Sequence, residues 1–363
     1  MLQEVSLENY RNLSIPRLKL TGGTIILVGN NSQGKTNILE AIHLLSYGRP
    51  FRGTKIDAIN WAAQSALIIG KTEREQISIC LNKNKETKIL LNSKIKGLID
   101  LFGKFVSVLF HPAEIETASG PPNLRRAWLD KTVATSNKAY LVNLINYQKA
   151  LRNRNRLLKS KDTASDVLEP WDRALAKFGS KIWIERSKSV VEINKLLKAL
   201  SARTIGKTLR LGYRNPILEE ELDKTEVRFL HILGTTRRVE QRVGTTVFGP
   251  HRDDFRFIIE EEAGSSIVEK DAALYGSRGE QRQCVVMLKL AEAAFLNKVF
   301  GRPPTILLDD VLSELDAANR SLLLANLRGS QVIITTTDVA AFEPEIKKKA
   351  KIMFVKQGKV QTR

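Results

Sequence analysis

Residues 29–36 constrain the fold of this chain more than any other stretch. They match the phosphate-binding pattern G-x-x-x-x-G-K-T and comprise Gly29, Asn30, Asn31, Ser32, Gln33, Gly34, Lys35 and Thr36. The apolar, β-branched run Thr24–Val28 predicts a buried strand before this loop, and apolar residues at helical spacing predict a helix after it. A glycine-rich turn with a surface lysine is the competing interpretation. The order of strand, loop and helix favours a nucleotide-binding α/β fold instead.

Each residue type in this loop has a chemical task in a nucleotide site. The two glycines let the backbone wrap closely around a polyphosphate, so that its N–H groups point at the phosphate oxygens. Lys35 supplies a positive charge for the β- and γ-phosphates, and the Thr36 hydroxyl is a ligand for Mg²⁺. We therefore expect a nucleotide and Mg²⁺ as cofactors.

An acidic pair follows a second predicted buried strand, Thr305–Leu308. Acidic residues at the carboxyl end of a strand in a nucleotide-binding fold belong beside Mg²⁺. Asp309 is placed to hold the metal, usually through water, and Asp310 is placed to orient or deprotonate an attacking water molecule. Both are candidate catalytic residues.

Two further places can contact an anion. Ser277 and Gly279 precede a long apolar-periodic helix, and the N–H groups at such a helix start bind anions, although helix-capping serines are common. Arg11 lies in a turn between two predicted strands, where a phosphate contact and a solvated charge are equally consistent with the sequence.

His251 follows a Gly-Pro turn and is either a structural residue or a catalytic base.

The rest of the chain reads as short strands around one long helical segment. Alternating apolar residues predict a hairpin from Ile77–Leu81 and Ile89–Leu91. Further strands are expected at 106–110, 255–259 and 332–336, with a closing hairpin at 353–360. From Gly120 to about Arg214 the periodicity is mostly helical.

The charge of the chain points to a polyanionic partner. There are 58 Lys and Arg against 39 Asp and Glu, a net charge of +19, which favours nucleic acid before an anionic membrane. The segment 121–214 holds 21 of the basic residues and 7 of the acidic ones, with a cluster at Arg152, Arg154, Arg156 and Lys159. A basic surface without a partner is the plain alternative, but concentration of the charge in one segment favours DNA binding there.

Cellular location is suggested by what the sequence lacks. The N-terminus has no basic and apolar leader pattern, and no apolar run approaches the length of a membrane span. Cys80 and Cys284 fit no metal spacing and read as reduced core residues. We expect a cytoplasmic protein without membrane association.

These motifs in this order resemble the RecF family of bacterial recombination mediators, which are ABC-type ATPase heads of the SMC/Rad50 kind. The resemblance extends over essentially the whole chain. It is carried by Leu7-x-Asn9-Tyr-Arg-Asn12, the loop 29–36, Gly48-Arg-Pro-Phe-Arg52, Arg125-Arg126-x-x-Leu129-Asp130, Gly249-Pro-His251, Ser277-Arg-Gly-Glu-Gln281 and Leu307-Leu-Asp-Asp-Val-Leu-Ser-Glu-Leu-Asp316.

Three features depart from the wider ABC pattern. In the signature motif Arg278 replaces a glycine and Glu280 is inserted before Gln281. A metal-sensing glutamine is not evident near residues 107–109, and the region Thr337-Asp338 stands where a switch histidine is usual. Whether His251 or Thr337-Asp338 takes over that role is open, and slow hydrolysis of ATP is expected.

The resemblance implies an α/β fold class: an ABC-type P-loop ATPase head, with a mixed sheet and an antiparallel subdomain, plus an inserted mainly helical lobe. Residues 1–111 and 245–363 would form the split head, and residues 112–244 the basic lobe. It also implies an ATP-dependent homodimer, in which Ser277 and Gly279 of one protomer contact the nucleotide on the loop of the other. Such a dimer would bind single-stranded or gapped DNA and aid recombinase loading with RecO and RecR, in DNA repair, replication restart and SOS induction.

Two other functions are weighed against this one. A membrane-associated transporter ATPase is disfavoured, because the 241 residues from Thr36 to Ser277 are about twice the usual insertion and no coupling loop is evident. A Rad50- or SMC-type head that acts with a nuclease would carry a long coiled coil, and no heptad run is visible.

Overall fold

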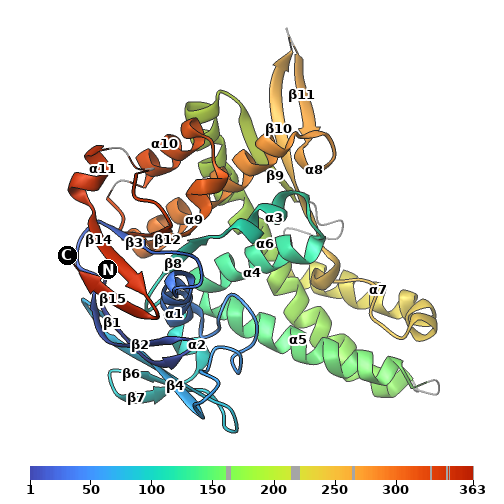
Figure 1. The fold of residues 1–363 in the computed structure, drawn as a ribbon. Coiled ribbons are helices and arrows are strands. Elements are labelled where there is room, and N and C mark those ends of the chain that lie inside the picture. Colours follow the sequence, from blue (N-terminus) through green and yellow to red (C-terminus); the bar gives the residue numbers. More distant parts are fainter. Residues whose placement is uncertain are drawn as a thin grey trace. The chain divides into compact units, whose positions relative to one another are not determined.

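The computed structural model describes residues 1–160, 165–213, 221–263, 266–327, 329–340, 342 and 344–362. The chain forms two compact units (Figure 1). The head unit comprises Met1–Ile115 and Val285–Arg363, and the lobe unit comprises Glu116–Cys284.

A six-stranded sheet with the order β15-β14-β3-β13-β12-β8 forms the centre of the head unit. All neighbours in it are parallel except β14 and β15. Its strands read as nearly continuous apolar runs, as expected for parallel strands covered on both faces. The predicted strands are confirmed to within a residue or two at their ends. They are β3 (Thr24–Val28), β8 (Ser107–Phe110), β12 (Thr305–Asp309), β13 (Val332–Thr336), β14 (Lys351–Lys356) and β15 (Lys359–Thr362).

The head unit also contains an antiparallel sheet with the order β2-β1-β4-β5-β6-β7. Buried and half-exposed residues alternate along β5, so this strand turns one face to the core. The hairpin predicted around residues 82–88 is confirmed as β5 and β6. The strands are β1 (Leu2–Tyr10), β2 (Leu13–Lys19), β4 (Ser65–Thr72), β5 (Gln76–Asn82), β6 (Lys88–Leu91) and β7 (Lys94–Lys96).

The principal helix of the head unit is α1 (Lys35–Tyr47), which begins directly after Gly34 and ends at Gly48. Gly48 adopts the left-handed conformation with φ 66°, and its N–H donates to the Leu44 carbonyl, a common helix end. Most residues of α1 are buried, so the loop before it is anchored on a fixed element. The shorter helices are α2 (Leu98–Leu101), η1 (Pro112–Ile115), η3 (Val311–Glu314), α10 (Ala317–Asn326) and α11 (Pro344–Lys349).

The lobe unit is mainly helical, with one small sheet. Its elements are α3 (Glu116–Ser119), α4 (Pro122–Ser136), α5 (Lys138–Leu158), α6 (Ser165–Ile205), β9 (Thr208–Tyr213), α7 (Leu222–Val243), η2 (Pro250–Arg252), β10 (Phe255–Ala263), β11 (Ser266–Asp271) and α8 (Ala272–Tyr275). Helix α9 (Arg278–Phe300) continues from this unit into the head unit.

The mostly helical prediction for residues 120–214 is confirmed by α4 to α6, but the sequence did not predict the strand β9 at the end of the segment. Residues 161–164 and Arg214 of that segment lie outside the described residues. Strand β9 pairs with β10, which pairs with β11. This pairing keeps β10 and β11 with the lobe unit, whereas the division predicted at residue 244 assigns their residues to the head.

Arg154 is a buried structural residue of the lobe unit and not a surface cation. Its side chain is 0% exposed, and it donates to Asp172 Oδ1 at 2.6 Å and to Thr246 Oγ1 at 2.8 Å. Its Nη2 lies 2.7 Å from Glu240 Oε2. Removing one partner of such a buried pair costs about 3–5 kcal/mol, so Arg154 stabilises the lobe. Its inclusion among the candidate DNA contacts was wrong.

The family motif at residues 125–130 and the two aspartates that follow the Gly249-Pro-His251 motif meet inside the lobe unit. Arg186, 2% exposed, lies with Nη2 2.7 Å from Asp130 Oδ1 and with Nη1 2.8 Å from Asp253 Oδ2. Arg125 makes a bidentate pair with Asp254, at 2.7 and 2.9 Å. Buried charges need this degree of pairing, so these motifs hold the lobe together.

His251 also has a structural role. Its Nε2 lies 3.1 Å from the Thr246 carbonyl, which can only accept, so Nε2 carries the proton. Nδ1 then accepts from the Tyr147 hydroxyl at 2.7 Å. Burial, outweighing the hydrogen bond with the Thr246 carbonyl, lowers the pKa of His251 to about 4, so the ring is neutral at pH 7. Of the two readings left open by the sequence, the structural one fits.

Within the described ranges, none of the helices is long and apolar enough to cross a membrane.

Candidate nucleotide-binding site

The loop 29–36 connects β3 to α1 at the carboxyl end of the parallel sheet, as predicted. Gly34 has φ 107°, a conformation that residues with a Cβ rarely adopt. At Gly29 an added Cβ would lie 2.3 Å from the Val355 carbonyl oxygen. Both glycines are therefore required by geometry.

Two neighbouring turns hold this loop in place. The Gln33 side-chain oxygen accepts from the Gln357 N–H at 2.8 Å, and the Gln33 carbonyl accepts from the Gly358 N–H at 3.0 Å. On the other side Asn12 Oδ1 accepts from Asn37 Nδ2 at 2.7 Å. The loop shape is thus fixed by the β14–β15 turn and the β1–β2 turn.

Lys35 lies within the curve of the loop. Its ammonium donates to the carbonyls of Gly29 at 2.7 Å and Asn30 at 2.9 Å. Burial lowers the pKa of Lys35, and the carboxylates of Asp310 and Asp309 oppose that effect. The Lys35 ammonium is therefore held within the loop, at a position where phosphate oxygens could contact it.

Thr36 and Asp309 form the candidate metal centre. The Thr36 hydroxyl donates to Asp309 Oδ1 at 2.8 Å, and the Thr335 hydroxyl donates to the same oxygen at 2.8 Å. Asp309 is only 3% exposed, because it ends the fully buried strand β12. A hydroxyl beside a fixed carboxylate is the oxygen donor set that Mg²⁺ prefers, so these residues fit the predicted ion.

His111 also faces Asp309, and the sequence analysis did not single it out. Its Nε2 lies 3.7 Å from Asp309 Oδ2, while its Nδ1 accepts from the Ala113 N–H at 3.2 Å. Since Nδ1 is the acceptor in that bond, Nε2 is the ring nitrogen that can donate toward the carboxylate. The residue could have been found by the reasoning used for Asp309, because it directly follows β8, the parallel neighbour of β12.

Asp310 is exposed and has φ 52°, in the left-handed region. Its N–H donates to the Thr335 hydroxyl at 2.9 Å, and its carbonyl accepts from Ser313 at 2.6 Å. The turn directs the chain out of β12 directly after the buried Asp309. This exposed position suits the predicted role of Asp310, which is to orient or deprotonate an attacking water molecule.

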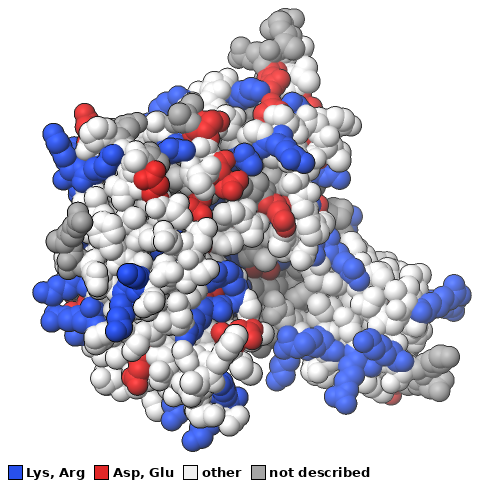
Figure 2. Space-filling model, in the orientation of Figure 1, with Lys and Arg blue, Asp and Glu red and all other residues white. Residues whose placement is uncertain are grey.

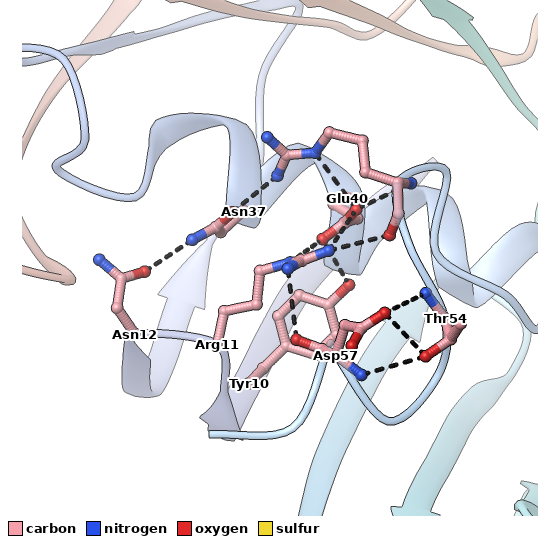
Figure 3. Close-up of polar contacts among 8 residues, drawn as sticks. Tyr10, Arg11, Asn12, Asn37, Glu40, Thr54 and Asp57 are labelled. Carbon is pink, nitrogen blue, oxygen red and sulfur yellow. Dashed lines mark hydrogen bonds and ion pairs between the residues drawn. The ribbon is translucent and has the colours of Figure 1, made fainter. Parts of the chain in front are cut away.

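Arg11 is engaged by a buried carboxylate (Figure 3). Its Nε and Nη2 both donate to Glu40, Nη2 also donates to the Arg52 carbonyl at 3.0 Å, and Nη1 donates to the Asp57 carbonyl at 3.3 Å. Among the described residues these bonds use four of the five N–H groups of Arg11. A phosphate contact from Arg11 stays a prediction, limited to the remaining N–H in this conformation.

Glu40 was missed by the sequence analysis, although it organises this corner of the site. It is 0% exposed and also accepts from the Tyr10 hydroxyl at 3.1 Å and from the Arg52 N–H at 3.1 Å. The signal was present, because a glutamate among the apolar positions of α1 must find cations once it is buried. The motifs at 9–12 and 48–52 supply those cations.

A cavity of about 750 Å³ lies beside the first turn of α1. Its lining includes Asn12, Asn37, Arg52 and Trp61. Asn37 directly follows Thr36, so one wall of the cavity comes from the residue next to the phosphate loop.

Ser277 and Gly279 lie in the lobe unit, and the phosphate loop lies in the head unit. Ser277 and Glu280 form a capping box: the Glu280 N–H donates to Ser277 Oγ at 3.2 Å, and the Ser277 N–H donates to Glu280 Oε2 at 2.8 Å. Lys207 and Lys270 contact the same carboxylate, each at 3.0 Å. The Ser277 backbone bond and then these lysines lower the pKa of Glu280 to about 2. Glu280, which departs from the ABC pattern, thus fixes the helix start.

Comparison with known proteins places the whole chain in one group. Residues 1–361 match the model of the RecF/RecN/SMC N terminal domain. The chain is 33% identical over 347 residues to the DNA replication and repair protein RecF of Thermoanaerobacter sp. (strain X514), covering 93% of this chain and 94% of that protein. It is also 33% identical over 368 residues to the DNA replication and repair protein RecF of Clostridium botulinum (strain Okra / Type B1), covering 99% of each.

Solved structures agree with this grouping. The recombination mediator protein RecF with ATPrS superposes with a TM-score of 0.91 at 29% identity, over 100% of this chain and 98% of that one. RecF with ATP gives a TM-score of 0.89 at 30% identity, over 100% and 97%. An Smc head domain from Pyrococcus furiosus, at 15% identity and a TM-score of 0.53, shares the fold.

Proposed function

The chain belongs to the RecF/RecN/SMC N-terminal domain family, and to the RecF proteins within it, and we propose that it is an ATP-gated DNA-binding protein of replication and repair. The proposal that the chain binds ATP rests on the Thr36 hydroxyl, which lies 2.8 Å from the Asp309 carboxylate and directly follows Lys35 in the chain. The relatives solved with ATP and ATPrS support the same ligand.

The residues of the head unit divide the work of nucleotide binding. The loop N–H groups and Lys35 bind phosphate oxygens, and Thr36 with Asp309 would hold Mg²⁺. When bound, the metal ion would neutralise part of the negative charge on the phosphates. Asp310 orients or deprotonates water, and the protein is a slow ATPase that uses hydrolysis as a switch.

Ser277 and Gly279 belong, in this proposal, to a composite site of an ATP-dependent homodimer. The capping box uses the Ser277 oxygen as an acceptor from the Glu280 N–H and leaves its O–H proton available to a γ-phosphate. The protomer whose loop holds the nucleotide would receive this donor from its partner. ADP, which has no γ-phosphate, would not join two protomers.

DNA is the proposed partner of the basic lobe unit. Figure 2 shows Lys and Arg side chains along α5. Arg152 and Arg156 are exposed on that helix, while Arg154 is buried. By family membership we also propose RecR and RecO as partners, single-stranded or gapped DNA as the ligand, and the cytoplasm, which suits the free Cys80 and Cys284, as the location.

The direct test is DNA binding in three nucleotide states. We expect the parent protein to retard a gapped oligonucleotide with ATP and Mg²⁺ but neither with ADP nor without nucleotide. Lys35→Met should bind ATP about 10- to 150-fold more weakly, because one charge-assisted contact contributes about 1.5–3 kcal/mol. It should also fail to retard DNA at ATP concentrations that saturate the parent. Equal ATP affinity of parent and variant, measured with a fluorescent analogue, would refute the role of this loop.

Arg152→Gln with Arg156→Gln should weaken DNA binding and flatten its dependence on salt. We expect the slope of log affinity against log salt to fall by up to about 0.7–0.9 for each phosphate that these arginines no longer neutralise. The matched control is Lys188→Gln with Lys195→Gln, which removes the same charge from ammoniums already paired with Glu185 and Glu192. Identical slopes for the two double variants would show that α5 is only a solvated face.

A further inference from the structure

Trp61 stands almost entirely in solvent, in contrast to the other tryptophans. Its side chain is 94% exposed, the largest value among the exposed apolar residues of the described chain. Trp128 and Trp183 are 5% and 1% exposed. Tryptophan buries a large apolar area wherever it is packed, so an indole left free in this way points to an external partner.

The exposure of Trp61 does not come from a loose loop. Asn60 donates from Nδ2 to the Arg11 carbonyl at 2.6 Å and from its backbone N–H to the Asn9 carbonyl at 2.8 Å. The Ala62 N–H donates to Asn60 Oδ1 at 3.0 Å, and the Trp61 carbonyl accepts from Lys83 Nζ at 3.1 Å. The backbone on both sides of the indole is therefore held, and the ring is presented by an ordered turn.

Positive charge surrounds this turn. Lys83 contacts it directly, and Lys55 donates to Thr87 at 3.2 Å, which joins the 52–61 loop to the turn between β5 and β6. The Trp61 surface, as we call it, consists of Trp61, Lys55, Lys83 and two exposed lysines of the β5–β6 turn and the start of β6, Lys85 and Lys88. Its only acidic neighbours along these segments are Asp57 and Glu86, so positive charge prevails.

We infer that the Trp61 surface is a contact site for single-stranded nucleic acid in the head unit, separate from the basic segment of the lobe unit. An aromatic ring surrounded by lysines suits a strand whose bases are unpaired, because the ring stacks on a base while the ammoniums contact phosphates. In a duplex the bases already stack on each other and offer no free face. The inference rests on the proposed DNA-binding function and names a second place where the strand is held.

Fluorescence and affinity test the inference together. With ATP and Mg²⁺ present, an oligothymidylate should quench the tryptophan emission of the parent, and Trp61→Ala should lose that part of the quench. The variant should bind the strand about 5- to 150-fold more weakly, the range expected when one base–aromatic stack is removed. Trp61→Phe keeps a stacking ring and should restore affinity. Neither change removes packing, because the side chain is 94% exposed.

A charge-matched pair separates this surface from general electrostatics. Lys85→Gln with Lys88→Gln should flatten the salt slope, whereas Lys71→Gln with Arg74→Gln, at the opposite end of the β4–β5 ladder, should not. Equal binding by parent and Trp61→Ala would overturn the inference alone, and a parent that binds no oligonucleotide would overturn the proposed function as well. An equal quench by ATP without DNA would place the nucleotide base on Trp61 and also overturn it.

Discussion

Asparagine at position 310 is expected to give a protein that binds ATP and dimerises but hydrolyses ATP about 10²- to 10⁴-fold more slowly. An amide cannot accept a proton from water, and this range is the usual contribution of a general base. The backbone should tolerate the change, because Asp310 has φ 52° and asparagine adopts this left-handed conformation as readily as aspartate. Because the Asp310 side chain is exposed, the substitution removes no packing contacts.

The measurement is phosphate release under single-turnover conditions, with ATP affinity determined in parallel. Asp338→Asn is the informative control, because Asp338 stands in the region where a switch histidine is usual. Hydrolysis by Asp310→Asn at the parent rate would remove Asp310 as the base. If Asp338→Asn slows ATP hydrolysis instead, the attacking water is positioned by the turn after β13.

Arginine at position 277 is expected to abolish ATP-induced dimerisation while the monomer still binds ATP. The phosphate loop lies in the head unit and keeps all its residues, whereas a γ-phosphate offered by the partner would meet a bulky side chain in place of a hydroxyl. Light scattering with ATP and Mg²⁺ should report a monomer. Loss of the cap costs about 1 kcal/mol, so the fold should survive.

Ser277→Asp provides the control for capping. Aspartate is as good an N-cap as serine, but its charge would face the γ-phosphate, so we expect this variant also to remain monomeric. A mixture of Ser277→Arg and Lys35→Met should form heterodimers with at most one intact composite site. If Ser277→Arg dimerises as the parent does, the residue has no role across the dimer.

The sequence predicted the strands of the sheet that contains β3 and the phosphate loop, because their signals are local, but it did not predict β4 and β7. Apolar runs, two glycines and an acidic pair after a strand each lie within about ten residues of one another. What it missed depends on distant pairing. Strand β9 is stabilised by β10, more than forty residues later, and Glu40 by Arg11 and Arg52 from two loops.

Arg154 shows a different kind of error, which helical periodicity could have prevented. Residues two apart on a helix lie about 200° apart around its axis, so Arg152 and Arg156 share a side that Arg154 does not. In the structure Arg152 and Arg156 are exposed, whereas Arg154 is fully buried. A charge count over the segment could not distinguish them.

The order of the strands in the parallel sheet has a consequence for biosynthesis. Strand β3 precedes the phosphate loop, but both of its neighbours in the sheet, β13 and β14, are made some three hundred residues later. The Gln357-Gly358 turn that holds Gln33 is made later still. A nascent chain that stops short of residue 332 therefore leaves both edges of β3 unpaired, a form prone to aggregation. Competence to bind ATP is therefore expected only after residues 357–358 have been made.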